Sequence, residues 1–516
     1  MIIVGTNALS TTAPNMTVYV AADGRGNFNC DGSDDQVEIN QALKYAAENP
    51  QFSTVYLKGP STYIISDSIL IGSETILEGD PTAVIKLKDQ ADWPRNKPLI
   101  TQMDSSGVDR VTIKGFEING NHDKNEDKMK GQGYYNMISF LDSQNIDVHG
   151  MYLHDGHGDG LRVERSSNIK FYNNKVYKLG HDGFYAIDCQ NVEAWKNRIT
   201  CRTNGGLRVW NSNYVKFYDN VIDSFYHWSA GGSAILIEKT TGVVNDVEVY
   251  NNTIHHTYGP GIWLIGYGAS YPKEEAQNVH IHNNIFYSTG TNPSIDWVGG
   301  IVTSGFYDTL IENNVFDNVY HAAIIQMYPS STSAGNSVDL SPQGTGFTTI
   351  VRNNIIVDTQ NRTKDPDGTG YGVINYLPST HTIVMENNCL YNNVGGNYKN
   401  ANSTSDIYVN PLFVNRNKHD YHLKSTGGRW NGKTWVKDPV SSPCIDAGHP
   451  DSDYSKEPGN NGDRINIGRY GNTECASISG NIPGYVVWWN QIFSPEWKTF
   501  RLLLRIFSLF CFNVLY

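Results

Sequence analysis

The central part of the chain alternates hydrophobic and polar residues in short runs, and one unit is repeated many times. Runs such as Val111-Thr112-Ile113, Ile169-Lys170-Phe171 and Val247-Glu248-Val249 place every second side chain on one face, which predicts β-strands. Each unit has a hydrophobic strand, an Asn-rich corner, a second hydrophobic strand, and a third strand that a Gly introduces. The pattern therefore predicts an all-β chain of repeated units.

The corners set the period of the repeat. They recur at intervals of 23 to 40 residues, which indicates a solenoid whose units accept insertions. Asn tolerates the left-handed backbone of a sharp corner, and stacked amides can form hydrogen bonds from coil to coil. The corners are Lys114-Gly115, His149-Gly150, Asn173-Asn174, Lys196-Asn197, Asp219-Asn220, Asn251-Asn252, Asn283-Asn284, Asn313-Asn314, Asn353-Asn354 and Asn387-Asn388.

Three strands per unit, with no helix between them, favour a right-handed parallel β-helix solenoid. A leucine-rich repeat would need a Leu-x-x-Leu-x-Leu motif with a helical half, and the units lack it. A propeller is the structural alternative, but its blades would need hairpin turns that the corners do not resemble. We therefore predict one β-helix domain over 17–478, with regular coils over 108–395 and closing coils over 400–478.

The two ends of the chain differ from the coils. The stretch 31–48 is amphipathic, with Ser33 or Asp34 as N-cap, and predicts a helix that covers the open end of the solenoid. The tail 479–516 is hydrophobic, but its last apolar run is shorter than the roughly 20 residues that span a bilayer. A capping helix, an interfacial helix and a non-native extension all remain open for this tail.

The net charge and the cysteine content argue against a nucleic-acid partner and against a zinc site. A formal net charge of −12 over 516 residues disfavours nucleic acid as a partner. Seven cysteines lie far apart without a Cys-x-x-Cys pair, so no zinc site is predicted, and buried free thiols are favoured over a Cys189–Cys201 bridge. We predict no metal, no cofactor and no integral membrane span; calcium dependence and oligomeric state stay open. The N-terminus holds at most the remnant of a signal peptide.

The third strands bring acidic residues of successive coils into register. Asp159 and Asp182 each precede a Gly, one coil apart, so their backbones should lie about 4.8 Å from each other. Two carboxylates this close cannot easily both ionise, and one should hold the proton that a general acid needs. Alternatively, Asp before Gly makes turns in which its side chain caps backbone amides. The predicted catalytic group comprises Asp155, His157, Asp159, His181 and Asp182.

An outward row beside these acidic residues suits an anionic sugar chain. The register stacks Arg162, Tyr185 and Arg208, with Trp263 farther along, and we expect this row to be exposed. Guanidinium groups pair with carboxylate or sulfate, and aromatic rings stack on sugar faces. A solvated outer face with incidental Arg is the alternative. The predicted substrate-binding residues are Arg162, Tyr185, Asp188, Arg208, Trp210, His227, Glu238 and Trp263.

Two end motifs carry a resemblance to a known family. The opening Tyr19-Val-Ala-Ala-Asp-Gly, and the closing Ser442-Pro-Cys-Ile-Asp-Ala-Gly with Asn466-Ile-Gly-Arg-Tyr-Gly-Asn, resemble the archaeal disaggregatase and disaggregatase-related family of β-helix carbohydrate-active proteins. The resemblance covers roughly 17–478. It implies an extracellular or cell-surface protein that depolymerises a chondroitin-like matrix polysaccharide of uronic acid and hexosamine and so disperses cell aggregates. No catalytic motif is carried over from the family.

Three functions are consistent with these residues. The leading hypothesis is an endo-acting glycoside hydrolase on an anionic polysaccharide, in which Asp159 and Asp182 supply acid and base or nucleophile. The first alternative is a polysaccharide lyase or uronan C5-epimerase, in which Arg neutralises the uronate and a Tyr, His or Lys abstracts the C5 proton. The second alternative is a non-catalytic surface or adhesion β-helix, because this fold also serves proteins without catalytic activity.

Overall fold

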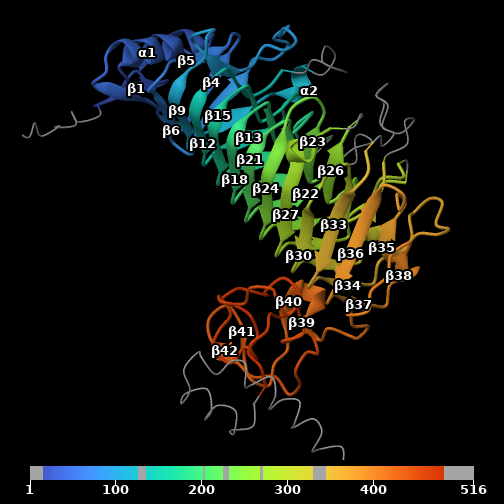
Figure 1. Ribbon diagram of the computed structural model, residues 1–516. Coiled ribbons are helices and arrows are strands. Elements are labelled where there is room, and N and C mark those ends of the chain that lie inside the picture. Colours follow the sequence, from blue (N-terminus) through green and yellow to red (C-terminus); the bar gives the residue numbers. More distant parts are fainter. Residues whose placement is uncertain are drawn as a thin grey trace, which may run out of the picture. The chain divides into compact units, whose positions relative to one another are not determined.

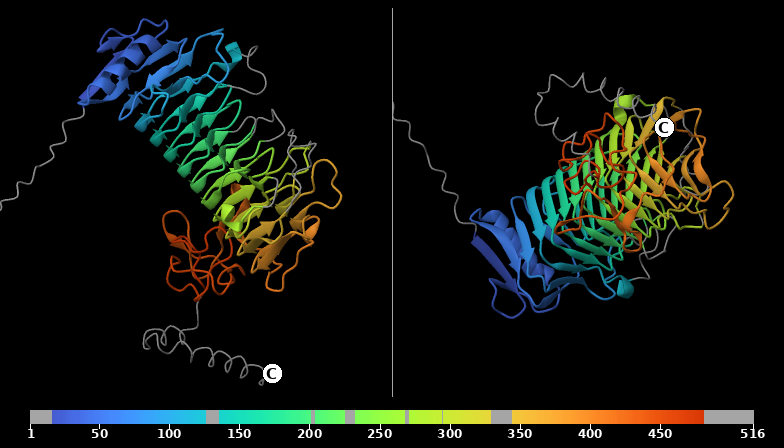
Figure 2. Two further views of the ribbon diagram at one scale, coloured as in Figure 1. Left: turned by 45° about the horizontal axis from the view of Figure 1, so that its top comes forward. Right: turned by 90° about the horizontal axis from the view of Figure 1, so that it is seen from below.

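Three long parallel sheets form most of the chain. The computed structural model describes residues 16–125, 135–200, 204–224, 232–267, 271–293, 295–328 and 344–480. Within these ranges, the strands of the three sheets follow one another in rotation, and each pairs in parallel with its equivalent in the next coil. The chain therefore winds as a parallel β-helix, as its repeat predicts (Figure 1), and two further views show the coils stacked behind one another (Figure 2).

Each regular coil contributes one strand to each sheet, in the order A, B, C. Sheet A has 14 described strands: β1 (Met16–Ala21), β2 (Phe28–Asn29), β3 (Phe52–Leu57), β6 (Ile76–Gly79), β9 (Asp109–Lys114), β12 (Gln144–His149), β15 (Ser167–Tyr172), β18 (Gln190–Trp195), β21 (Asn213–Tyr218), β24 (Val244–Tyr250), β27 (Ala276–His282), β30 (Thr309–Glu312), β33 (Phe347–Arg352) and β36 (His381–Glu386).

Sheets B and C have 12 described strands each. Those of sheet B are β4 (Ser61–Ile65), β7 (Ala83–Leu87), β10 (Glu117–Asn119), β13 (Tyr152–His154), β16 (Lys175–Tyr177), β19 (Arg198–Thr200), β22 (Val221–Asp223), β25 (Thr253–His255), β28 (Ile285–Tyr287), β31 (Val315–Asp317), β34 (Ile355–Val357) and β37 (Cys389–Tyr391). Those of sheet C are β5 (Ile69–Ile71), β8 (Ile100–Gln102), β11 (Ile138–Leu141), β14 (Leu161–Glu164), β17 (Phe184–Ile187), β20 (Leu207–Trp210), β23 (Ile235–Lys239), β26 (Ile262–Gly266), β29 (Ile301–Ser304), β32 (Ala322–Gln326), β35 (Tyr371–Asn375) and β38 (Gly396–Lys399).

The regular coils begin earlier than the sequence predicts. The rotation of strands starts at β3, whereas the corners had placed the first regular coil near residue 108. The first coils turn at Gly59-Pro60 and Gly79-Asp80, which lack the Asn that marks the later corners. This part of the chain therefore has the strands of a coil but lacks the Asn residues from which the corners were identified.

Alternate side chains of each strand fill the interior of the solenoid. Leu161, Phe184 and Leu207 pair across three strands of sheet C, and all three are fully buried. Burying such a side chain contributes about 1.5–3 kcal/mol relative to leaving it exposed. The hydrophobic alternation in the sequence thus corresponds to one continuous core along the coils.

A ladder of buried amides runs along the corner between sheets A and B. The first residue of a corner is left-handed, as at Asn173 (φ 54°). The second satisfies backbone groups: Asn197 Oδ1 accepts from the Asn174 N–H at 3.0 Å, and Asn197 Nδ2 donates to the Phe171 carbonyl at 2.9 Å. Unpaired backbone groups inside the coil would cost free energy. The ladder comprises Asn174, Asn197, Asn220, Asn252, Asn284, Asn314, Asn354 and Asn388.

Helix α1 (Gln36–Glu48) covers the N-terminal end of the stack (Figure 1). It begins at Gln36 and not at residue 31, and neither Ser33 nor Asp34 is its N-cap residue. Asp35, which precedes it, directs its carboxylate to the backbone N–H of Ile64 at 2.7 Å instead of capping the helix. The other helices among the described residues are the short α2 (His122–Asn125), η2 (Lys273–Glu275) and η3 (Arg416–Lys418).

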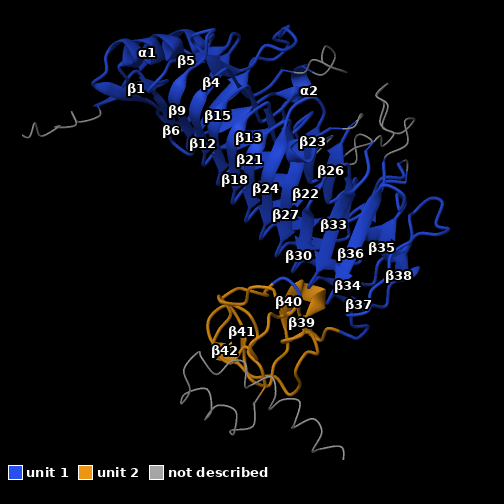
Figure 3. Cartoon of the chain, in the orientation of Figure 1, with its two compact units in different colours: residues 1–410, 467–469 blue, residues 411–466, 470–516 orange. Residues whose placement is uncertain are grey.

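The chain divides into two compact units, 1–410 with 467–469 and 411–466 with 470–516 (Figure 3). The second unit contains two antiparallel strand pairs: β39 (Phe413–Asn415) with β40 (Asp420–Leu423), and β41 (Arg429–Trp430) with β42 (Trp435–Val436). The expectation that 400–478 closes the stack with further coils is therefore wrong.

Antiparallel strands need only a short turn, such as the one at Asn431-Gly432, whereas a further coil would need another complete repeat unit. Nearly all of the tail 479–516 lies outside the described residues, which end at 480. None of the described helices is long and apolar enough to cross a membrane.

Candidate functional site

The outer face of sheet C carries the row that the repeat predicts. Arg162 pairs in register with Tyr185, and Tyr185 with Arg208, across β14, β17 and β20. The row continues through Leu236 to Trp263 on β23 and β26. The register read from the Gly-led strands is therefore confirmed.

The same row is less exposed than predicted. Tyr185 is 5% exposed and Trp263 is 7% exposed. The Arg162 and Arg208 guanidinium carbons lie 5.1 and 4.4 Å from the centroid of the Tyr185 ring, and Trp263 stacks on Trp297 at 4.2 Å. Cation–π contacts and apolar packing remove these rings from water. The expectation of an exposed aromatic platform is wrong for Tyr185 and Trp263.

Two carboxyl groups from neighbouring coils meet at one histidine. His181 Nδ1 lies 2.6 Å from Asp159 Oδ1 and 3.2 Å from Asp182 Oδ2. The side chains of Asp159 and Asp182 are 1% and 0% exposed, whereas that of His181 is 24% exposed. The imidazole is thus the part of this cluster that faces solvent.

The carboxyl groups also belong to a second side-chain ladder. Asn136 Oδ1 accepts the backbone N–H of Asp159 at 3.0 Å, Asp159 Oδ1 accepts that of Asp182 at 2.8 Å, and Asp182 Oδ1 accepts that of Gly205 at 2.5 Å. These are the amide contacts that the alternative interpretation of Asp before Gly predicts. Asp159 uses Oδ1 both for the ladder and for His181, whereas Asp182 uses Oδ1 for the ladder and Oδ2 for His181.

Glycine lets successive coils approach closely at this corner. A Cβ atom on Gly160 would lie 2.4 Å from the Gly183 carbonyl oxygen, and one on Gly183 would lie 2.5 Å from the Gly206 carbonyl oxygen. Any side chain at these positions would force the coils apart. The Asp-Gly sequence therefore places each carboxyl group within reach of the next coil.

Arg208 anchors the side of the cluster toward β23. Its Nε donates to Glu238 Oε2 at 2.6 Å, and its Nη1 lies 3.3 Å from Asp182 Oδ2. Tyr267 donates its hydroxyl to Glu238 Oε1 at 2.9 Å, and the Trp210 ring lies 5.4 Å from the guanidinium. Arg208 is therefore neutralised by two buried carboxyl groups, which leaves it little capacity for an anionic ligand.

Arg162 lies on the side of the cluster toward Asp159 and Glu164, and it is more exposed than Arg208. Its Nε donates to Glu164 Oε1 at 2.6 Å, and its Nη1 lies 3.6 Å from Asp159 Oδ2. Arg162 and Glu164 are each 29% exposed, against 11% for Arg208. Arg162 and His181 are consequently the cationic groups of this cluster that can meet a ligand.

Burial and charge separate the titrating groups. Burial disfavours the charged form of His181, but Asp159 and Asp182 outweigh it and raise the pKa of His181 to about 9. Burial raises the pKa of Asp182 above its usual range, despite the opposing charges of His181 and Arg208. Burial acts in the same direction on Asp159, yet the charge and hydrogen bond of His181, with the charge of Arg162, lower its pKa. At neutral pH we therefore expect an imidazolium beside an ionised Asp159.

A cation suits this cluster poorly. One ligand atom each of Asp159, His181 and Asp182 lies within 4.8 Å of the others. The Arg162 and Arg208 guanidinium groups, however, already lie 3.6 and 3.3 Å from the same carboxyl groups. Their charges occupy the place that a calcium ion would take, so the donor set does not favour calcium.

Two of the predicted catalytic residues lie in neighbouring clusters. Asp155 follows β13, where its carboxylate lies 2.6 Å from His154 Nδ1 and 3.2 Å from Lys178 Nζ. His157 is buried and stacks on His122, with ring centroids 4.0 Å apart.

The remaining predicted binding residues are scattered. Asp188 is exposed at the end of β17, where its backbone N–H donates to the Trp210 carbonyl at 2.9 Å. Trp210 is half-buried and donates Nε1–H to Thr240 Oγ1 at 2.8 Å. Glu238 is buried behind Arg208 and serves the protein rather than a ligand. His227 lies outside the described residues.

Sequence reasoning missed Tyr267 and Asn136. Asn136 stands two residues before β11, as Asp159 stands two residues before β14, so the same alignment extended by one coil would have found it. Tyr267 directly follows Gly266, which pairs with Lys239 at the end of β26. The strand alignment extended by one residue would have placed it near Glu238.

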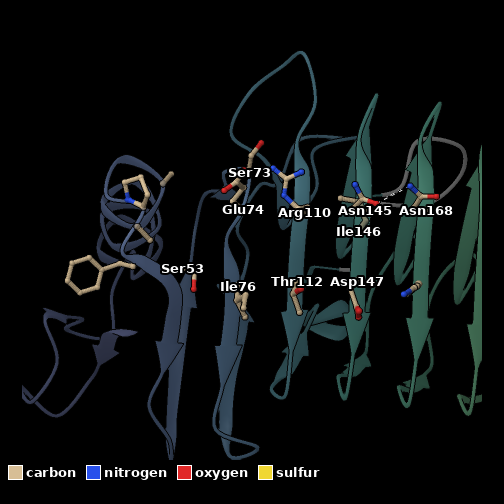
Figure 4. A pocket seen from close by; sticks show the side chains of 15 residues that line it. Ser53, Ser73, Glu74, Ile76, Arg110, Thr112, Asn145, Ile146, Asp147 and Asn168 are labelled. Carbon is tan, nitrogen blue, oxygen red and sulfur yellow. Dashed lines mark hydrogen bonds and ion pairs between the residues drawn. The ribbon is translucent and has the colours of Figure 1, made fainter. Parts of the chain in front are cut away.

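A separate groove of about 890 Å³ lies on the outer face of sheet A, beside the C-terminal end of α1 (Figure 4). Glu74, Arg110, Asn145 and Asn168 line one edge of it, and Asn168 Nδ2 donates to Asn145 Oδ1 at 2.9 Å. None of the predicted site residues that the structure describes lines this groove. The groove and the cluster on sheet C are therefore distinct surfaces of the first unit.

Comparisons with known proteins agree with the fold. The disaggregatase-related family model matches residues 244–448, and the model for right-handed β-helix regions matches 101–222 and 136–292. These matches confirm the resemblance that the end motifs indicate, and they identify the solenoid as right-handed. No curated protein matches the chain.

Several solved structures are similar at low identity. The A-module of a mannuronan C-5 epimerase from Azotobacter vinelandii is 14% identical, with 73% of this chain and 94% of that one covered and a TM-score of 0.48. A family 28 exopolygalacturonase from Yersinia enterocolitica is 13% identical, with 77% and 78% covered and a TM-score of 0.45. A surface protein and adhesin of Streptococcus pneumoniae is 13% identical, with 73% and 96% covered and a TM-score of 0.40.

Proposed function

We propose that this right-handed parallel β-helix, which carries the disaggregatase-related pattern over residues 244–448, cleaves an anionic polysaccharide on the outer face of sheet C. The observation that carries the proposal is His181, a half-buried imidazole that contacts two buried carboxyl groups through Nδ1. A partly exposed histidine held through Nδ1 in this way suits proton transfer to a bound sugar.

His181 would act as the general acid. With a pKa of about 9, the ring holds its second proton at neutral pH, and this proton can pass from Nε2 to the glycosidic oxygen as the bond breaks. Asp159 and Asp182 would position the ring and stabilise its charge. They would not touch the substrate, because their side chains are buried.

The spacing of the two carboxyl groups supports this division of roles. One carboxylate oxygen of Asp159 lies within 4.8 Å of one carboxylate oxygen of Asp182. Acid and nucleophile of a retaining glycosidase stand about 5–5.5 Å apart on either side of the bond, and those of an inverting one about 6.5–9.5 Å. A buried pair closer than this leaves no room for a sugar or a water between its members. We assign the base or nucleophile to Glu164, the half-exposed carboxylate that Arg162 holds.

Arg162 would recognise the negative charge of the substrate. It is the more accessible of the two arginines, and it borders His181 through the shared contact with Asp159. A uronate carboxylate or a sulfate could pair with its free N–H groups. A chondroitin-like chain of uronic acid and hexosamine, acted on outside the cell, fits this arrangement and the family resemblance.

A lyase or C5-epimerase is the second candidate, and the proximity of Arg162 to His181 favours it. Arginine would neutralise the uronate, and histidine would remove the C5 proton. Because His181 takes up a proton below a pKa of about 9, it can serve as a base only in alkaline solution. Elimination would therefore be fastest at alkaline pH, and hydrolysis near neutrality.

Incubation of the protein with chondroitin, chondroitin sulfate and other uronic-acid polymers, followed by mass analysis, tests the proposal. Hydrolysis adds one water per cleavage, whereas elimination adds none and yields an unsaturated product that absorbs in the ultraviolet. The hydrolase assignment requires the first result and is overturned by the second. Absence of any product, with retained binding, would instead support an adhesion solenoid.

A further inference from the structure

The outer face of sheet A carries a second cluster of metal-binding side chains, away from His181. His280 and His282 stand two residues apart on β27, so both point outward. Glu248 pairs in register with His280 from β24, and Glu312 pairs with His282 from β30. The three strands are neighbours in sheet A (Figure 1). Four ligand-type side chains from three coils thus meet on one surface.

The spacing of these side chains suits a small metal ion. His282 Nε2 lies 3.2 Å from Glu248 Oε1, and one ligand atom each of Glu248, His280 and His282 lies within 4.8 Å of the others. Ligands about 2.0–2.1 Å from a tetrahedral zinc ion stand about 3.4 Å from one another. The distance between His282 Nε2 and Glu248 Oε1 is close to this value, and His280 supplies a third ligand atom within 4.8 Å of the other two.

The ring of His282 is oriented by a fixed amide. Its Nδ1 lies 2.6 Å from Asn283 Oδ1. The Nδ2 of the same amide donates to the Arg469 carbonyl at 2.6 Å, which sets the amide with its oxygen toward the ring. His282 Nδ1 is therefore a protonated nitrogen, and Nε2, which lies 3.2 Å from Glu248 Oε1, is the nitrogen that would release its proton and bind a metal ion.

The ring of His280 has a carboxylate in the equivalent role. Its Nε2 lies 2.9 Å from Glu312 Oε1, and Glu312 Oε2 accepts from Arg352 Nε at 2.8 Å. Metal-binding histidines almost always donate their second N–H to a carboxylate or carbonyl oxygen, which fixes the tautomer. Both histidine rings of the cluster make such an outer contact, as histidines that bind a metal ion do.

The cluster is accessible. The side chains of Glu248, His280 and His282 are all partly exposed. Lys216 Nζ lies 3.4 Å from Glu248 Oε2 and competes for that carboxylate, but the lysine side chain is mostly exposed and can turn into solvent. A metal ion can therefore enter from solution without a change in the backbone.

We propose that Glu248, His280 and His282 bind one divalent transition-metal ion, with water completing its coordination. Imidazole and carboxylate together suit Zn²⁺, Ni²⁺ or Cu²⁺, whereas Ca²⁺ and Mg²⁺ prefer oxygen ligands alone. The ion links β24 to β27, and it therefore joins two successive coils of the solenoid. This site does not depend on the proposed polysaccharide cleavage.

Titration of the full chain with Zn²⁺ after removal of metals by a chelator tests the site. We expect one Zn²⁺ bound per chain, and a thermal midpoint that rises with the Zn²⁺ concentration. The double variant His280→Gln, His282→Gln should lose this binding. His149→Gln is the matched control, because His149 lies on the same face and stacks on Tyr172 at 4.5 Å, outside the cluster.

Two single substitutions distinguish a residue that binds the metal ion from one that only orients a ligand. Glu312→Gln removes only the outer partner of His280 and should weaken Zn²⁺ binding about 10–100-fold without abolishing it. Glu248→Gln keeps both rings in place and should weaken binding more than Glu312→Gln does. Unchanged Zn²⁺ stoichiometry and affinity in the double variant, or Ca²⁺ binding as tight as Zn²⁺ binding, would overturn the proposal.

Discussion

The backbone N–H of Asp182 donates a hydrogen bond to Asp159 Oδ1 at 2.8 Å, so a carboxylate of one coil holds the backbone of the next. The same oxygen lies 2.6 Å from His181 Nδ1. One atom thus supports both the stacking of the coils and the orientation of the imidazole. Substitution of Asp159 consequently affects stability and chemistry together, and tests of the site have to separate the two.

Replacement of the histidine gives the most direct test of catalysis. We expect His181→Gln to reduce kcat by about 10²–10⁴-fold, because general acid catalysis is worth this much and glutamine cannot supply a proton. The measurement is the initial rate of product release from the polymer. His154→Gln is the control, since His154 also contacts two carboxylates, Glu117 and Asp155, but lies on β13 in sheet B. Equal losses in both variants would contradict a specific role for His181.

The double variant Asp159→Asn, Asp182→Asn should keep the ladder and lose the charge. Asparagine oxygens can still accept the N–H groups of Asp182 and Gly205, so the coils should remain stacked. Without the carboxylates, the pKa of His181 should fall from about 9 toward its usual value, and activity at neutral pH should drop with it. Histidine titration followed by NMR measures the first effect. Full activity in this variant would remove the carboxylates from the mechanism.

The stability of the fold should depend on pH through His181. Its pKa of about 9 in the folded chain exceeds the value of 6.5 that is expected once the chain unfolds. The resulting stability is fully present below about pH 6.5 and is lost as pH rises through about 9, with a magnitude of up to about 3 kcal/mol. Denaturant unfolding of the wild type and of His181→Gln at several pH values measures it. The difference between the two proteins should shrink over this window; a constant difference would contradict the assignment.

The two arginines should differ in what they affect. Arg208→Ala leaves Asp182 and Glu238 buried without their partner, and should lower the free energy of unfolding by about 3–5 kcal/mol. Arg162→Ala removes a half-exposed group and should mainly raise KM for the anionic polymer. Thermal unfolding and steady-state kinetics on both variants distinguish these effects. A larger loss of stability in Arg162→Ala would reverse our assignment of roles.

Each Asn of the buried amide ladder should stabilise the fold through several hydrogen bonds. Asn252→Ala leaves the Asn220 N–H and the Phe217 carbonyl without their partner inside the coil, and should cost about 2–4 kcal/mol. Gln190→Ala, at an exposed position of β18, should change stability by less than about 0.5 kcal/mol. Denaturant midpoints compare the two. A neutral Asn252→Ala would mean that water replaces the amide.

The sequence by itself determined the solenoid and much of its register. Alternation of hydrophobic residues sets which face of a strand is buried, and Asn corners set where one strand ends and the next begins. In a parallel stack, equal spacing then aligns residues of successive coils. For this reason Arg162, Tyr185 and Arg208, and likewise Asp159 and Asp182, could be placed above one another from residue numbers alone.

Only the tertiary structure decided which of these side chains meet solvent and which partners they take. Trp263 is buried because Trp297, from the segment between β28 and β29, stacks on its ring. Tyr185 is buried because two guanidinium groups cover its ring, and His181 meets both carboxyl groups through a single nitrogen. Register follows from the local repeat, whereas exposure depends on insertions and side-chain directions, which no periodic pattern encodes.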